Sequence, residues 1–108
     1  MNSTGCNFKH TIVERAGRDP AFARAMLDEA ATLFLNDEPE VARSILRDLV
    51  NATVGFEALA AKTGTPSKSL HRMLSASGNP TMDNLAGVFG AIRKSLKVDL
   101  RVRVTRAA

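Results

Sequence analysis

The feature that most constrains this chain is a series of short amphipathic segments, each separated from the next by helix-capping or helix-breaking residues. Within each segment, apolar side chains recur every three or four residues, which is the periodicity of a helix with one buried face. Proline, glycine, asparagine and aspartate interrupt the series at residues 19–20, 36–39, 55, 64 and 78–80. We therefore expect an all-α fold of several short helices around one core.

Two longer helices are expected in the first half of the chain. Asp19 is a favourable N-cap, and Pro20 suits the first helical position, where its missing N–H costs nothing. Asp37 and Glu40 are three positions apart and match a capping box that opens the second helix. These helices are expected to span about residues 19–35 and 37–51.

Three shorter helices are expected in the second half. Gly64 ends the first after about two turns, Pro66 lies at the start of the next, and Thr81 is a good N-cap for the last. Gly87 and Gly90 weaken this last prediction, because glycine in a helix interior costs up to about 1 kcal/mol relative to alanine. The three helices are expected to span about residues 56–63, 65–74 and 81–96.

The hydrophobic pattern changes period near the C-terminus. From Val98 to Val104, apolar residues alternate with polar or charged ones, which is typical of a β-strand. A single strand in a helical chain has no partner in its own chain, so residues 98–104 are expected either to close a dimer or to extend another protein's sheet. The alternative is a frayed basic tail that alternates by chance.

Length and composition indicate one cytoplasmic domain. A chain of 108 residues suits one compact core, which we place at residues 19–108 after an N-terminal arm of residues 1–18. Residues 8–16 of this arm are expected to form a short helix or to stay irregular. Hydrophobic residues make up 44% of the chain and no apolar stretch approaches the ~20 residues that span a bilayer, so no membrane segment is expected. Cys6 is the only cysteine; we expect a free thiol, and no metal or other cofactor.

Charge is distributed unevenly along the chain. Residues 1–54 contain six Lys or Arg and eight Asp or Glu, whereas residues 55–108 contain nine and three. A basic half is expected of a protein that meets phosphates, and an acidic half suits a basic protein partner. Either half also fits an ordinary solvated surface.

Residues 56–74, FEALAAKTGTPSKSLHRML, fit the template of a helix-turn-helix. Ala60 supplies the small residue where the two helices cross, and Gly64 supplies a residue that tolerates a left-handed backbone in the turn. Leu59, Leu70 and Met73 are expected to form the apolar wedge that sets the angle between the helices. This arrangement would present the second helix to a DNA major groove. The alternative is an ordinary helical hairpin with a glycine turn.

The outward side chains of the second helix are all able to form hydrogen bonds. Arg72 is the best candidate for a bidentate contact with guanine, and Ser67, Lys68 and Ser69 suit bases or phosphates. His71 is a weaker candidate, because a lone surface histidine is usually incidental. No metal site is expected, since the chain has only one other histidine.

Two overlapping stretches carry a family resemblance: ARSILRDLVNATVGFEALAAKTGTPSKSLHRMLS and, above all, LHRMLSASGNPTMDNL. Through them, residues from about 19 to 103 resemble the HigA-type, lambda-repressor-like antitoxins of bacterial toxin–antitoxin modules. This resemblance implies a lambda-repressor-like helix-turn-helix domain with an extra N-terminal helix and a short C-terminal strand. It also implies a homodimer that binds a palindromic double-stranded DNA operator, represses its own operon and holds a RelE/ParE-like toxin inactive.

Mapped onto the family's motif, the base-reading positions fall on Ser67, Lys68 and Arg72. Phosphate contacts are expected from the remaining polar positions, Ser69, His71, Asn79 and Thr81. Two positions depart from the pattern: Phe56 stands where such families often carry glutamine, and Pro66 stands near the position where a serine cap is more usual. The first departure puts a phosphate contact in doubt, and the second leaves Ser67 either as a helix cap or as a base reader.

These observations favour a transcriptional regulator that binds and does not turn over a substrate. A second hypothesis is a protein-interaction module that holds a toxin but whose helix-turn-helix does not read DNA, which the phenylalanine at position 56 favours. A third is a repressor without a toxin. An enzyme is not expected, because the sequence offers no nucleophile–base pair, glycine-rich phosphate loop or metal-ligand spacing.

Overall fold

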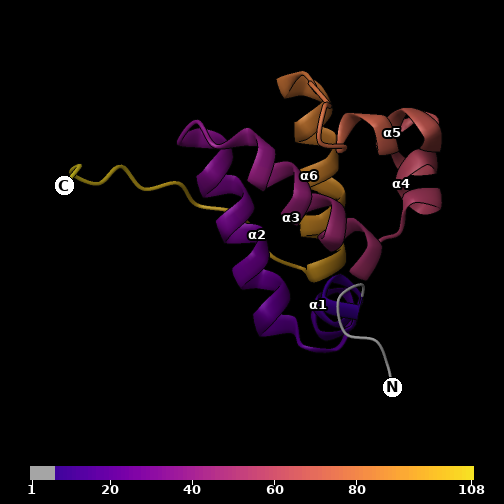
Figure 1. The fold of residues 1–108 in the computed structure, drawn as a ribbon, viewed down its shortest axis with the longest axis horizontal. Coiled ribbons are helices and arrows are strands. Elements are labelled where there is room, and N and C mark those ends of the chain that lie inside the picture. The colour runs from indigo at the N-terminus through magenta and orange to yellow at the C-terminus, as the bar shows by residue number, and fades with distance from the viewer. Residues whose placement is uncertain (1–6) are drawn as a thin grey trace.

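Six α-helices form the framework of the computed structural model, which describes residues 7–108 (Figure 1). They are α1 (Asn7–Arg18), α2 (Pro20–Leu35), α3 (Pro39–Ala52), α4 (Phe56–Thr63), α5 (Ser67–Met73) and α6 (Met82–Leu96). The all-α class is confirmed. The segment expected as a short helix or an irregular arm forms α1, whereas Cys6 lies outside the described residues.

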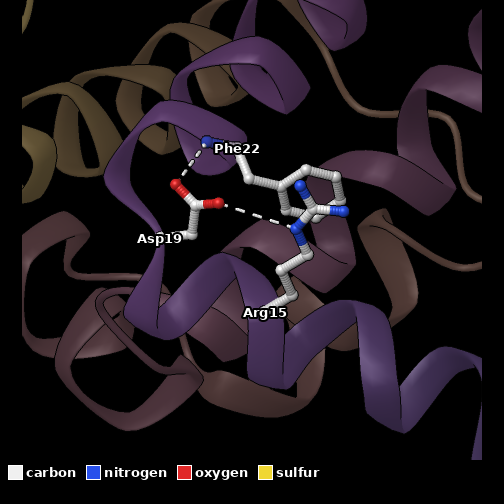
Figure 2. Close-up of polar contacts among 3 residues, drawn as sticks. All are labelled: Arg15, Asp19 and Phe22. Carbon is white, nitrogen blue, oxygen red and sulfur yellow. Dashed lines mark hydrogen bonds and ion pairs between the residues drawn. The ribbon is translucent and has the colours of Figure 1, made fainter.

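Asp19 connects α1 to α2 and caps α2, as predicted (Figure 2). Its Oδ1 atom accepts a hydrogen bond of 3.2 Å from the Phe22 N–H, one of the donors that the first turn of a helix leaves unpaired. Its Oδ2 atom lies 3.6 Å from Arg15 Nε, and the Arg15 guanidinium lies 4.2 Å from the centre of the Phe22 ring. The cap, the ion pair and the cation–π contact together fix the corner between the helices.

The turn between α2 and α3 differs from the predicted capping box. Glu38, not Asp37, is the N-cap of α3, and its side chain makes no capping hydrogen bond. Asp37 instead has φ 68°, a left-handed conformation, and the following Glu38 N–H donates to the Leu33 carbonyl at 2.8 Å. Asp37 therefore serves to end α2, in the position that glycine or asparagine usually takes after a helix.

Helices α1, α2 and α3 pack on one another, α6 contacts α2 and α4, and α4 contacts α3 and also packs against α5. Where α2 meets α6, the Phe34 and Phe89 rings lie 5.9 Å apart in an edge-to-face arrangement. Ala16 of α1 is also buried, so this helix packs on the same core. The largest fully buried side chains are Leu27, Leu46, Leu49, Val50, Leu59, Leu70, Leu74, Val88 and Ile92. None of the helices in the described part of the chain is long and apolar enough to cross a bilayer.

The strand expected over residues 98–104 is not present in the single chain. Lys97 ends α6 in a left-handed conformation, with φ 59°, and residues after it have neither helical nor strand structure. Val98 and Leu100 still pack against the core, whereas Val102 and Val104 are 72% and 95% exposed. A strand needs a neighbouring strand for its hydrogen bonds, and residues 7–108 supply none. Figure 1 shows this segment extending away from the helices, on the side opposite to α4 and α5.

Candidate nucleic-acid interface

Helices α4 and α5 occupy the stretch predicted to form a helix-turn-helix, and they are joined at Gly64. Gly64 has φ 73° and ψ 13°, a left-handed conformation that glycine adopts without a steric penalty. Its N–H donates to the Ala60 carbonyl at 2.9 Å, which closes α4. The left-handed turn residue predicted between the two helices is therefore present at Gly64.

One side of α5 is buried against the rest of the protein. Leu70 is 1% exposed, and Leu59 from α4 is completely buried. Ala60 and Met73 are partly buried and pack against the same core. A helix of seven residues is too short to be stable alone, so these contacts must determine how α5 is presented.

The exposed side of α5 carries its basic residues. Lys68 and Arg72 are both exposed, and they lie four positions apart on one helix face. Ser67 and Ser69 are half-buried. Pro66 is the N-cap of α5 and no side chain caps this helix, so Ser67 does not serve as the cap. Of the predicted base readers, the two basic residues are the more accessible.

The His71 side chain is exposed on one face and packs against Phe56 with the other. The two rings are stacked, with 3.8 Å between their centres and 19° between their planes. Phe56 is 6% exposed, whereas His71 remains exposed. The phenylalanine therefore joins the first residue of α4 to the middle of α5, a contact that the sequence alone did not indicate.

The loop between α5 and α6 carries the other two predicted phosphate contacts. Asn79 and Thr81 are both exposed. The Thr81 hydroxyl oxygen accepts a hydrogen bond of 3.1 Å from the Asn84 N–H, which confirms that Thr81 caps α6. Because a hydroxyl that accepts one hydrogen bond still has a proton to donate, Thr81 keeps the ability to bind a phosphate oxygen.

Two arginines of α3, which sequence reasoning missed, hold the chain just after α5. Arg43 donates from Nε to the Ser75 carbonyl at 3.0 Å and from Nη2 to the Ala76 carbonyl at 2.8 Å. Arg47 donates from Nη1 to the Leu74 carbonyl at 3.1 Å. Although it carries a charge, Arg43 is only 7% exposed. Both side chains therefore act in positioning α5 and the following loop.

Gly78 brings the same loop close to the end of α5. A β-carbon at this position would lie 2.1 Å from the Met73 carbonyl oxygen and 2.6 Å from the Arg72 carbonyl oxygen. Both distances are far shorter than any real contact, and backbone atoms cannot move aside as a flexible side chain can. Glycine is thus required here by the close approach of two backbone segments. The sequence showed Gly78 only as part of a helix-breaking cluster.

The described residues contain no group of three or more His, Cys, Asp or Glu side chains placed to hold a metal ion. Comparison with known proteins adds no assignment: no family model, no curated protein and no solved structure matches the chain. The resemblance to HigA-type antitoxins stays a prediction.

Proposed function

We propose that this protein is a sequence-specific, DNA-binding transcriptional regulator that acts in the cytoplasm as a homodimer. The observation that carries the proposal is the arrangement of α5, whose apolar side is buried against α4 and the core while Lys68 and Arg72 are exposed. Such a helix, held firmly and basic on its outer side, suits the major groove of DNA. The net positive charge of residues 55–108 supports the same proposal.

In this proposal each polar residue has a defined role. Arg72 donates two hydrogen bonds to guanine, and Lys68 contacts a base or a phosphate. Ser67 reads a base, and the phosphate contacts come from Ser69, His71, Asn79 and Thr81. Lysine and arginine also release counterions from the DNA, so the affinity falls as salt rises.

We also propose that the protein is an antitoxin, which represses its own operon and neutralises a RelE/ParE-like toxin. Support comes from the region around the α2–α3 turn. Residues 25–42 contain five acidic side chains and no basic one, and all five acidic residues are exposed. Leu35 and Val41 lie in the same stretch and are 58% and 51% exposed. An acidic surface with exposed apolar side chains suits a basic protein partner.

The DNA-binding proposal is tested by fluorescence anisotropy with the DNA upstream of the gene and with a scrambled duplex, across a salt series. The wild type should prefer its own DNA by roughly a thousandfold, with a steep salt slope. Arg72→Ala should remove most of this preference. Arg24→Ala, which removes an exposed arginine from α2, is the control for a general loss of charge. Equal, weak binding of the wild type to both duplexes would contradict the proposal.

The antitoxin proposal is tested with the basic protein encoded by a neighbouring reading frame. Asp28→Asn, Glu29→Gln and Glu40→Gln together should weaken binding of that protein but leave operator binding unchanged, because these residues lie on α2 and α3. Equal loss of both activities in a folded variant would contradict a separate toxin surface. A gene with no such neighbour would favour a repressor without a toxin.

A second function is favoured by the contact between Phe56 and His71. The phenylalanine is buried and holds one face of the imidazole, so the start of α4 offers no polar side chain at this position for a phosphate. A protein-interaction module that binds a toxin but does not read DNA is consistent with this feature. It predicts toxin binding together with equal, weak affinity for both duplexes.

A further inference from the structure

The C-terminal segment after α6 has the features of a strand that lacks its neighbour. Val98 and Leu100 pack against the core, but the next two apolar residues, Val102 and Val104, are exposed. The last backbone hydrogen bond along the described chain joins the Val98 N–H to the Arg93 carbonyl, at 3.0 Å. Beyond Val98, an alternating segment therefore has its backbone groups and its valines in solvent.

We propose that residues 98–104 pair with the same residues of a second copy as an antiparallel two-stranded ribbon, centred on Arg101. This interface deepens the proposed function, on which its role in operator binding rests. A second copy suits the segment because antiparallel pairing about a two-fold axis gives both strands a neighbour at once.

The alternation restricts the register of this ribbon. Residues directly opposite each other in an antiparallel pair point to the same face of the sheet, so apolar positions must face apolar positions. With Arg101 on the axis, Leu100 lies opposite Val102 of the second copy and Val98 lies opposite Val104. The two exposed valines of each copy then lie beside the two residues that already pack on the other copy's core.

Charge distinguishes this register from the neighbouring ones that keep the apolar faces together. Centred on Arg101, the ribbon places Asp99 opposite Arg103 of the second copy, twice, and leaves one Arg101 pair on the solvent side. Centred on Leu100, the ribbon places Asp99 opposite Arg101 twice, but it also places Lys97 opposite Arg103 twice and Val104 opposite Leu96 of α6. Centred on Val102, it pairs Arg101 with Arg103 twice. Like charges directly opposite are destabilising, so the Arg101 register is favoured.

The hydrogen bond at Val98 is consistent with this register. Pairs in an antiparallel ladder alternate between hydrogen-bonded and non-hydrogen-bonded. Since the Val98 N–H is already used within its own chain, Val98 takes a non-hydrogen-bonded position, and so do Leu100 and Val102. Side chains approach more closely at such positions, which favours the apolar contacts. Asp99, Arg101 and Arg103 then carry the hydrogen bonds between the copies.

Sedimentation velocity of the full chain, over a range of concentrations and without DNA, tests the ribbon. The wild type should dimerise, and the variant Val102→Asp/Val104→Asp should dimerise at least about tenfold more weakly. Both valines are exposed in the single chain, so thermal unfolding monitored by circular dichroism should show an intact fold. Val41→Asp, at an exposed valine on α3, is the matched control and should dimerise normally.

Charge reversal tests the register. Arg103→Asp alone should weaken the dimer, and Asp99→Arg combined with Arg103→Asp should restore it, because the opposite charges again face each other. Asp99→Arg alone should also weaken the dimer, and adding Arg101→Asp to it should not restore dimerisation. Asp99 also lies 3.8 Å from Arg93, but this carboxylate is 92% exposed and the ion pair is weak.

Three results would overturn the proposal: a monomeric wild type up to about 100 μM, a dimer that Val102→Asp/Val104→Asp leaves unchanged, or rescue by Arg101→Asp in place of Arg103→Asp. DNA binding is measured separately. A protein that dimerises through the ribbon but shows no DNA preference would contradict the proposed function and support the ribbon. A monomer that binds its operator specifically would support the proposed function and contradict the ribbon.

Discussion

Truncation of Arg43 to alanine tests how the protein holds α5. Arg43 is on α3, is 7% exposed, and donates to the Ser75 and Ala76 carbonyls just beyond the end of α5. Alanine removes both hydrogen bonds; the Ser75 carbonyl keeps the one that it accepts from the Gly78 N–H at 3.0 Å, whereas the Ala76 carbonyl loses its arginine partner. The α5–α6 loop should then be held less firmly to α3, where the Arg47 bond to the Leu74 carbonyl remains, although no residue of α5 has changed.

The expected cost follows from the number and type of these bonds. A hydrogen bond to a charged group contributes about 1.5 to 3 kcal/mol, so two contribute about 3 to 6 kcal/mol. Ser75 is half-buried and Ala76 is exposed, so water can reach the freed carbonyls and the lower end of the range applies. We expect Arg43→Ala to lower the free energy of unfolding by about 3 kcal/mol and Tm by roughly 15 °C.

Urea unfolding followed by circular dichroism measures this cost, with Arg47→Ala as the matched control. Arg47 makes one such bond, to the Leu74 carbonyl, and should cost about 1.5 kcal/mol. Arg43→Lys should recover less than half of the loss, because an ammonium group cannot reproduce the fork of a guanidinium. A cost for Arg43→Ala that is below about 1 kcal/mol, or no larger than that of Arg47→Ala, would refute the reasoning.

Five further substitutions at four positions test the local geometry, each by urea unfolding. Gly78→Ala should destabilise the protein by at least about 2 kcal/mol, because its β-carbon would meet backbone oxygens. Gly90→Ala in α6, with open space around it, should stabilise the protein by up to about 1 kcal/mol. Equal effects of the two substitutions would contradict the close backbone approach at Gly78. Asp19→Ala should cost about 1 kcal/mol and Asp19→Asn much less, since asparagine keeps the capping oxygen; an equal cost would assign the effect to the ion pair. Asp37→Gly should stabilise by about 0.5 to 1 kcal/mol by relieving its left-handed backbone, and a loss would show that the carboxylate has a structural role.

The sequence predicted best those features that depend on neighbouring residues. Asp19 and Thr81 cap their helices through an N–H three positions ahead, and Gly64 forms its turn with a carbonyl four positions behind. The Asp37 capping box was wrong although it is equally local. Asp37 suits two local motifs, a cap that opens α3 and a left-handed residue that ends α2, and the structure shows the second.

The features that the sequence did not reveal depend on distant parts of the chain. Arg43 and Arg47 contact carbonyls 27 to 33 positions away, and backbone carbonyls have no residue signature. Phe56 stood out as a departure from the pattern of similar antitoxins, but only the structure shows the ring it contacts. Glycine is required at position 78 because two backbone segments approach each other in space, and in the sequence Gly78 looks like any other loop glycine.

These distant contacts bear directly on how α5 would read DNA. A seven-residue helix gains little from its own hydrogen bonds, so its orientation depends on the buried leucines, the α3 arginines and the approach at Gly78. If α5 is the reading helix, residues that never touch DNA set its affinity. Arg43→Ala, measured well below its melting temperature, should then weaken specific and non-specific binding together, because the whole helix is displaced. Arg72→Ala should instead remove the preference between sequences while the fold and most of the non-specific affinity remain.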